Sequence, residues 1–215
     1  MTVEAKICGI STRDAAEAAI AGGADLIGLV FFSRSPRAVT PAQAGALAGL
    51  LPASIKKVGL LVDPEDQLIE SILAEAELDL LQLHGDEAPA RVAEIRRRFG
   101  VAVMKTLKIT AGSDFAAVDA YLDVADRLLF EAKAPREMVD ALPGGNAVSF
   151  DWSLLAGRHW PLPWMLAGGL RADNLARAVQ TSGAKAVDVS SGVEDAPGQK
   201  NPQKIRAFLD LVKTL

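Results

Sequence analysis

The chain contains a single cysteine, one tyrosine and two histidines among 215 residues, and these scarcities exclude several kinds of protein. One cysteine cannot form an internal disulfide, so a disulfide-stapled scaffold is excluded and a reducing, cytoplasmic location is expected. One cysteine and two separated histidines do not make a zinc-binding pattern, so we expect no metal ion. No apolar run reaches the roughly 18 residues that cross a bilayer, and no signal peptide is visible, so we expect no membrane partner.

The charge balance does not indicate a nucleic-acid partner. The net charge is −4, with 50% hydrophobic and 23% charged residues, which is ordinary for a globular domain. A nucleic-acid binder more often has a basic face. The densest basic run, Arg96–Arg98, lies near the end of a predicted helix, where cations favour the helix dipole. We interpret it as a solvated helix end, and the length predicts one domain over residues 1–215.

Short apolar runs alternate along the chain with alanine-rich stretches whose apolar residues recur at helical spacing. The predicted strands are Ala5–Gly9, Leu26–Phe31, Lys57–Val62, Leu78–Leu83, Ala102–Leu107, Arg127–Phe130, Trp164–Ala167 and Lys185–Val189. The predicted helices include Thr12–Ala21, Pro41–Leu50, Pro64–Glu77, Ala88–Phe99 and Asp173–Thr181. Near-continuous apolar strands are typical of a parallel sheet that is covered on both faces.

This alternation predicts the α/β class, either as a closed barrel or as an open doubly wound sheet. Eight strands in one short chain favour a single (β/α)8 TIM barrel with a parallel eight-stranded core. An open flavodoxin-like sheet needs fewer strands and is the alternative. The active site of such a barrel lies at the carboxyl ends of its strands. A long connection from Ala132 to Asn146 follows the sixth strand, and loops of this length are usually functional or disordered.

Two glycine- and serine-containing loops predict a phosphate site. Gly168 and Gly169 follow the seventh strand, and Ser190, Ser191 and Gly192 follow the eighth. Glycines let the backbone approach an anion, and N–H groups at a turn or helix start then bind it. One such loop alone would be read as an ordinary tight turn, but two at the usual phosphate position of this fold favour the site.

Polar side chains stand at several strand ends, and two of them are candidates for proton transfer. Cys8 is either a small buried apolar residue or a base, and it acts as a base only if its surroundings lower its pKa. Glu131 is either a salt-bridge partner of Lys133 or Lys105, or an acid whose pKa is raised by a partly apolar mouth. Asp126 is a weaker candidate acid, because it precedes the sixth strand.

Five sequence motifs together resemble the phosphoribosylanthranilate isomerase family of tryptophan biosynthesis. They are Lys6–Ile10, Phe31–Arg37, Leu81–Gly85, Gly144–Gly145 followed by Phe150–Ser153, and Asp188–Glu194. The resemblance covers essentially the whole chain and implies an Amadori rearrangement of N-(5-phosphoribosyl)anthranilate. It implies no cofactor, a small phosphorylated substrate as the partner, and a monomer or homodimer.

The resemblance also implies roles for individual residues. It makes Cys8 the general base and Glu131 the general acid. Arg37, whose guanidinium fork suits a carboxylate, would hold the anthranilate carboxylate. The other implied contacts are Gln82, His84 and Asp188 to the substrate, and Gly168, Gly169, Ser190, Ser191 and Gly192 to the phosphate.

Two residues depart from the family pattern. Glu131 stands where an aspartate is usual, and Ala147 stands where a glycine is common. These departures leave room for a catalytically impaired phosphate-binding barrel. A histidine-pathway isomerase of the same fold is a further alternative, but that family uses aspartates as acid and base, so Cys8 argues against it.

Overall fold

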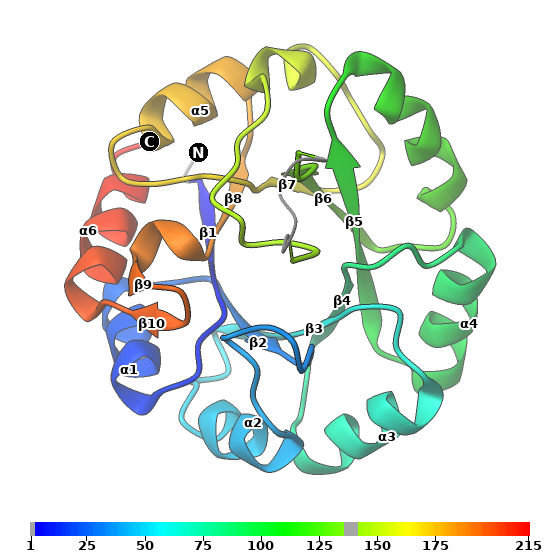
Figure 1. Ribbon diagram of the computed structural model, residues 1–215, viewed down its shortest axis with the longest axis vertical. Coiled ribbons are helices and arrows are strands. Elements are labelled where there is room, and N and C mark those ends of the chain that lie inside the picture. Colours follow the sequence, from blue (N-terminus) through cyan, green and yellow to red (C-terminus); the bar gives the residue numbers. More distant parts are fainter. Residues whose placement is uncertain (1–2, 136–141) are drawn as a thin grey trace.

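Eight parallel strands close in chain order into a barrel in the computed structural model, which describes residues 3–135 and 142–215 (Figure 1). The strands are β1 (Glu4–Cys8), β2 (Leu26–Val30), β3 (Lys56–Leu61), β4 (Leu80–Leu83), β5 (Ala102–Ile109), β6 (Arg127–Ala132), β7 (Trp164–Leu166) and β8 (Ala186–Val189). The barrel closes where β1 pairs with β8, in a register that places Lys6 opposite Asp188. The predicted barrel is confirmed, and the open sheet is excluded.

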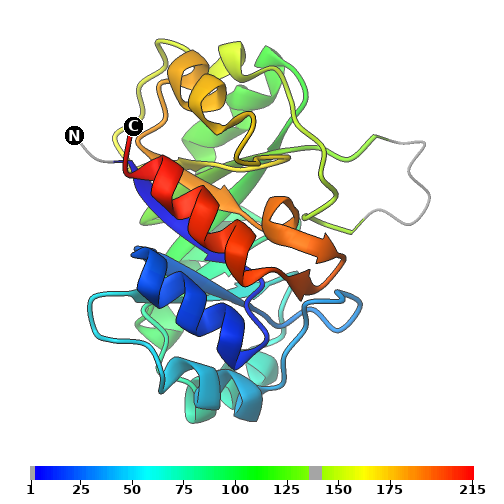
Figure 2. The ribbon, with the colours of Figure 1, turned by 90° about the vertical axis from the view of Figure 1, so that its left-hand side faces the viewer.

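Helices surround the barrel (Figures 1 and 2). The α-helices are α1 (Arg13–Gly22), α2 (Pro41–Ala48), α3 (Asp66–Glu75), α4 (Pro89–Phe99), α5 (Leu175–Ser182) and α6 (Pro202–Val212). Three 3-10 helices complete the described connections: η1 (Gly112–Tyr121), η2 (Trp152–Leu155) and η3 (Ser191–Val193). Local sequence sets the boundaries of α1, because the Thr12 hydroxyl accepts a hydrogen bond from the Ala15 N–H and Gly23 ends the helix in the left-handed region.

A hairpin of two short strands follows the barrel. It consists of β9 (Glu194–Ala196) and β10 (Gln199–Lys200), and it lies at the carboxyl-end side of the strands (Figure 2). Neither this hairpin nor α6 is among the elements predicted from the sequence.

The barrel interior changes from apolar to polar towards the carboxyl ends of the strands. Its apolar layer is one buried cluster, formed by Leu26, Val58, Leu80, Met104, Leu129, Met165, Ala167 and Ala186. Side chains two residues apart on a strand share a face, so Gln82 follows Leu80 inside the barrel, and Asp188 follows Ala186. The apolar layer therefore closes the barrel below a polar mouth.

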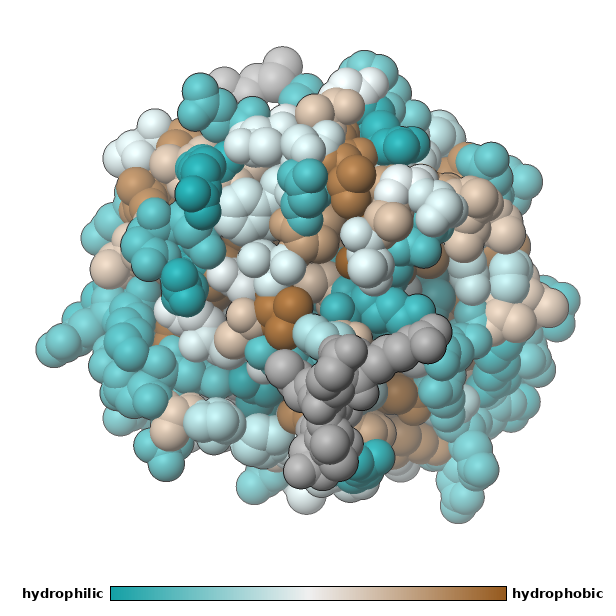
Figure 3. All heavy atoms as spheres, turned by 45° about the horizontal axis from the view of Figure 1, so that its top comes forward, coloured by the Kyte–Doolittle hydropathy of each residue, from teal (hydrophilic) through white to brown (hydrophobic). Residues whose placement is uncertain are grey.

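The visible surface in Figure 3 is mainly hydrophilic, with apolar residues in small groups. Across residues 3–135 and 142–215, the only large apolar side chain classed as exposed is Leu68. None of the helices in these ranges is long and apolar enough to cross a membrane.

Candidate active site

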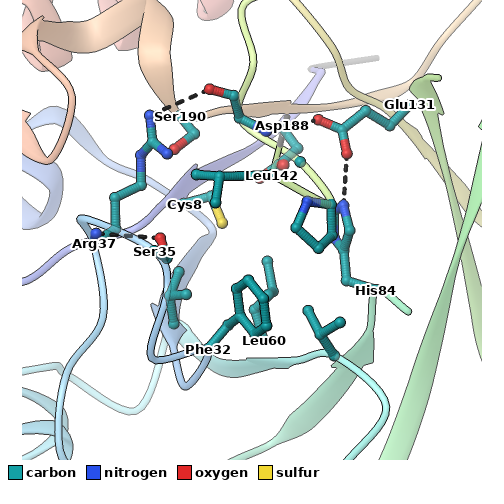
Figure 4. Close-up of a pocket in the computed structure, with 15 residues that line it drawn as sticks. Cys8, Phe32, Ser35, Arg37, Leu60, His84, Glu131, Leu142, Asp188 and Ser190 are labelled. Carbon is teal, nitrogen blue, oxygen red and sulfur yellow. Dashed lines mark hydrogen bonds and ion pairs between the residues drawn. The ribbon is translucent and has the colours of Figure 1, made fainter. Parts of the chain in front are cut away.

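A pocket opens at the carboxyl ends of the strands and brings together residues that are far apart in the sequence (Figure 4). Six of the predicted site residues line it: Cys8, Arg37, His84, Glu131, Asp188 and Ser190. Apolar side chains such as Phe32 and Leu60 form part of the wall. The site thus combines an apolar surface with a few charged groups, which is the usual composition of a small-molecule pocket.

Glu131 and His84 form a buried pair at one side of the pocket (Figure 4). The Nε2 atom of His84 lies 2.6 Å from Oε2 of Glu131. On the other side of the ring, Nδ1 lies 2.9 Å from the amide nitrogen of Gln82. With that amide donating to Nδ1, the ring proton is on Nε2 and is donated to Glu131. Gln82 is fully buried and does not line the pocket, so it supports the His84 ring.

The surroundings of Glu131 change its expected charge. Burial opposes ionisation, but the His84 ring, the Gly145 N–H and the Lys6 charge together hold the pKa of Glu131 below its ordinary value. The expectation of a raised pKa is therefore wrong, because it considered burial without these three partners. Glu131 pairs with His84 rather than with Lys105, whose ammonium lies 2.6 Å from Glu87. Asp126 accepts hydrogen bonds from the Val103 N–H and Arg96, before β6 begins.

Cys8 lies at the end of β1, is 4% exposed and is a free thiol. Burial raises the pKa of this thiol, and the Asp188 charge adds to the rise, whereas Lys6 and Lys200 oppose it. The resting thiol is therefore protonated. The surroundings of Cys8 therefore do not provide the lowered pKa that a thiolate base requires.

Arg37 is held by a carboxylate that the sequence did not identify as a partner. Its Nε lies 2.7 Å from Oε1 of Glu194, and Nη2 lies 2.8 Å from Oε2. The buried ammonium of Lys200 also contacts Glu194 and donates to the Ser190 carbonyl at 3.1 Å and to its hydroxyl at 3.2 Å. Burial opposes the Glu194 charge, but Arg37 and Lys200 hold its pKa below the ordinary value. Glu194 binds the Arg37 guanidinium through both carboxylate oxygens and thereby fixes its position at the pocket wall.

Comparison with known proteins identifies the family. The sequence profile described as N-(5'phosphoribosyl)anthranilate (PRA) isomerase matches residues 5–211. The chain belongs to this family. A relative from Paramagnetospirillum magneticum, named N-(5'-phosphoribosyl)anthranilate isomerase, is 58% identical over 209 residues, which cover 97% of this chain and 96% of the relative. The resemblance inferred from the sequence motifs is confirmed.

Solved structures of family members have the same barrel. Phosphoribosyl anthranilate isomerase from Thermotoga maritima superposes with a TM-score of 0.87 at 32% identity, covering 99% of this chain and 100% of that one. A second structure, of phosphoribosyl anthranilate isomerase in complex with reduced 1-(o-carboxyphenylamino)-1-deoxyribulose 5-phosphate, has a TM-score of 0.82 at 30% identity. It covers 99% of this chain and 100% of that one.

Residues 142–145 of the connection after β6 line the isomerase pocket. The middle of the long connection predicted here, residues 136–141, lies outside the described residues. Gly144 faces the His84–Glu131 pair so closely that a Cβ atom there would meet both side chains. The Gly145 N–H donates to Oε1 of Glu131 at 3.3 Å, and its carbonyl accepts from Arg37 at 3.4 Å. Ala147, the departure from the family pattern, has a positive φ of 57°.

The predicted phosphate residues divide into two groups. Ser190 lines the pocket, whereas Gly168, Gly169, Ser191 and Gly192 do not. Gly168 and Gly169 have φ values of 90° and 64°, and the backbone of Val148 and Ser149 packs against them. Both positions therefore require glycine for conformation and for space. Their phosphate role stays a prediction.

Proposed function

We propose that this chain catalyses the Amadori rearrangement of N-(5'-phosphoribosyl)anthranilate to 1-(2-carboxyphenylamino)-1-deoxyribulose 5-phosphate in tryptophan biosynthesis. Its family membership gives the reaction, and one observation supports the assignment of catalytic residues: a thiol and a carboxyl group line the same pocket. Cys8 is the general base, and Glu131 is the general acid. Two such groups with separated pKa values can perform two successive proton transfers.

The reaction begins at the ribose ring. Glu131 protonates the ring oxygen as the bond from that oxygen to the first carbon breaks, and the nitrogen lone pair forms a Schiff base. The Cys8 thiolate then removes the proton from the second carbon, and the electron pair of that C–H bond forms an enolamine. Addition of a proton at the first carbon and loss of one from the enol oxygen give the ketone. Glu131 and Cys8 perform the first two transfers, the ketone step takes one proton from solvent and returns one to it, and no cofactor enters the scheme.

The proton distribution must change before each turnover. The raised pKa of Cys8 and the lowered pKa of Glu131 favour a thiol and a carboxylate in the resting site. The reactive form has the same number of protons, with one proton moved from the thiol to the carboxylate. Turnover returns the site to its resting distribution, because Glu131 loses a proton and Cys8 gains one. We infer that the active form of the enzyme is the minor one, in which Cys8 is a thiolate and Glu131 is protonated.

The remaining side chains have binding roles in the proposal. Arg37 holds the anthranilate carboxylate through its Nη1 edge, because Nε and Nη2 face Glu194. Asp188 and His84 contact the sugar, and Gln82 acts through His84. Ser190 binds the phosphate with the neighbouring backbone of Ser191, Gly192, Gly168 and Gly169.

The proposal needs one copy of the chain. Every residue assigned above comes from the single barrel of residues 1–215, so a monomer and a homodimer both fit it. The base must also remain reduced, and a reducing cytoplasm keeps a free thiol in that state.

Cys8→Ser is the direct test. We expect a loss of kcat of about 100- to 10,000-fold, the usual contribution of general acid–base catalysis, with an unchanged circular dichroism spectrum. Near-normal turnover in this variant would remove Cys8 from the role of base. The wild-type chain is assayed with phosphoribosylanthranilate and with the substrate of the histidine-pathway isomerase. Turnover of only the second substrate, or of neither, would support an alternative function.

A further inference from the structure

Lys6 is a fully buried charged residue to which the proposed mechanism gives no role. Its exposed fraction is 0%, and it lies on β1 two residues before Cys8. Residues two apart on a strand point to the same face, so both side chains face the barrel interior. The Nζ atom of Lys6 lies 2.8 Å from Oδ1 of Asp188 on the adjacent strand β8. The ammonium group therefore lies beneath the proposed base.

Gly28 brings the ammonium group and the thiol together. This residue pairs with Cys8 across the β1–β2 ladder. A Cβ atom at Gly28 would lie 3.0 Å from Sγ of Cys8 and 3.1 Å from Nζ of Lys6. The Cys8 thiol and the Lys6 ammonium therefore both lie directly above Gly28 of β2. Any larger residue at position 28 would push one of them away.

We propose that Lys6 is the counter-ion of the Cys8 thiolate, a positioning residue that acts on the base through its charge. This inference rests on the proposed role of Cys8 as the base. A charge that forms in a buried site is stabilised strongly by a nearby opposite charge, because little water screens it. A buried ion pair can often be replaced by apolar residues at no cost in stability, so folding alone does not require Lys6 and Asp188.

Other charged groups also act on Cys8. Asp188 raises the pKa of the thiol, and Lys200 on β10 lowers it. Lys200 is already bound to Glu194, and burial lowers its own pKa despite that partner. Arg37, Glu131 and His84 line the rest of the same pocket. Burial also opposes the charge on Lys6, but Asp188 and Cys8 hold the pKa of Lys6 above its ordinary value, so the ammonium is charged at neutral pH.

The test uses the fact that Cys8 is the only cysteine in the chain. Thiolate absorbance near 240 nm and the pH dependence of alkylation by iodoacetamide then report on this residue alone, without any assay of activity. In Lys6→Met we expect the pKa of Cys8 to rise by about one unit or more. We also expect kcat to fall at least tenfold, with KM changed less than threefold. An unchanged thiol titration would overturn the proposal.

Two further variants separate this role from a structural one. Lys6→Met with Asp188→Asn removes the whole ion pair and leaves no unpaired carboxylate, so it also serves if the single variant fails to fold. We expect its thiol to titrate above that of the wild type, because the counter-ion is absent. A return to the wild-type value would show that Lys6 only neutralises Asp188.

The matched control is Lys105→Met. Lys105 is also a buried lysine, at 2% exposure, but it pairs with Glu87. Its variant should leave the Cys8 titration unchanged, and an equal shift there would attribute the effect to general loosening of the barrel. The titration is independent of the base assignment. An active Cys8→Ser would therefore refute Cys8 as the base while leaving the effect of Lys6 on the thiol of the wild-type chain measurable.

Discussion

His84 donates from Nε2 to Oε2 of Glu131 over 2.6 Å, and both side chains are buried at the pocket wall. The other oxygen of Glu131 accepts from the Gly145 N–H. Both oxygens of the carboxyl group are thus held, although the Glu131 side chain is one methylene longer than the aspartate usual in the family. Burial alone would raise the pKa of Glu131, but the His84 ring, the Gly145 N–H and the Lys6 charge together keep it below its ordinary value.

Replacing His84 should change the pH dependence of the enzyme in a defined direction. In His84→Gln, burial acts on Glu131 with less opposition, so the pKa of its carboxyl rises. At a pH below the pKa of Glu131, both Cys8 and Glu131 are protonated, so the Cys8 thiolate that the reaction needs is missing. The acidic limb of the kcat/KM profile should therefore move to higher pH. His159→Gln is the control, because His159 is exposed and remote from the pocket. An unmoved acidic limb in His84→Gln would contradict the proposed effect of His84 on the pKa of Glu131.

The two conservative changes at Glu131 should have very different effects. Glu131→Gln keeps the shape but cannot donate an acidic proton, so we expect kcat to fall at least about 100-fold. Glu131→Asp keeps the acid but withdraws it from His84 by one methylene, so we expect a loss of about tenfold or less. Single-turnover rates at saturating substrate measure both. A Gln variant with full rate would mean that another group is the acid.

The alkaline limb tests the proposed proton distribution. Above the pKa of Cys8 both groups are deprotonated, and no acid remains to open the ring. Burial raises that pKa, and the partners of Glu131 lower the other one, so the profile should have a broad plateau between them. A profile of kcat/KM against pH in the wild type measures this width. A narrow bell centred near neutrality would contradict the inferred resting state.

The eight strands could be predicted to within two residues because each is a short apolar run bounded by turn residues. The carboxyl ends of the strands of such a barrel meet at one face, so Cys8 and Glu131 could both be placed at that face. The pKa directions could not be predicted in this way. They depend on pairs such as Arg37 with Glu194, which lie 157 residues apart, and on whether Gly145 returns to the mouth. A local sequence pattern carries no information about contacts between residues so far apart in the chain.

The Arg37–Glu194 pair should control substrate affinity more than rate. Glu194→Gln removes the charge that holds the Arg37 fork, while the amide keeps the size of the side chain. The guanidinium then loses its fixed direction, so we expect KM to rise about tenfold, which corresponds to roughly 1.4 kcal/mol of binding, with kcat changed less than threefold. Asp195→Asn is the matched control, because Asp195 pairs with Lys204 at the exposed surface. A fall in kcat without a rise in KM would contradict this role.

Ala147 should be a site where glycine stabilises the enzyme. Its φ of 57° lies in the left-handed region, which costs an L-residue about 1–2 kcal/mol. Glycine removes that cost but loses about 0.5–1 kcal/mol through its freedom in the unfolded chain. We expect Ala147→Gly to stabilise the fold by about 0.5–1 kcal/mol, which raises Tm by about 1–4 °C for a chain of this size.

Ala111→Gly is the control for this prediction. Ala111 is also exposed, but its φ of −140° is ordinary extended backbone, so glycine offers no relief there. Only the entropic loss remains, and Tm should fall in this variant. Thermal unfolding followed by circular dichroism measures both changes. Opposite signs at the two alanines would show that the backbone at position 147 is strained in solution, whereas equal falls would show that it is not.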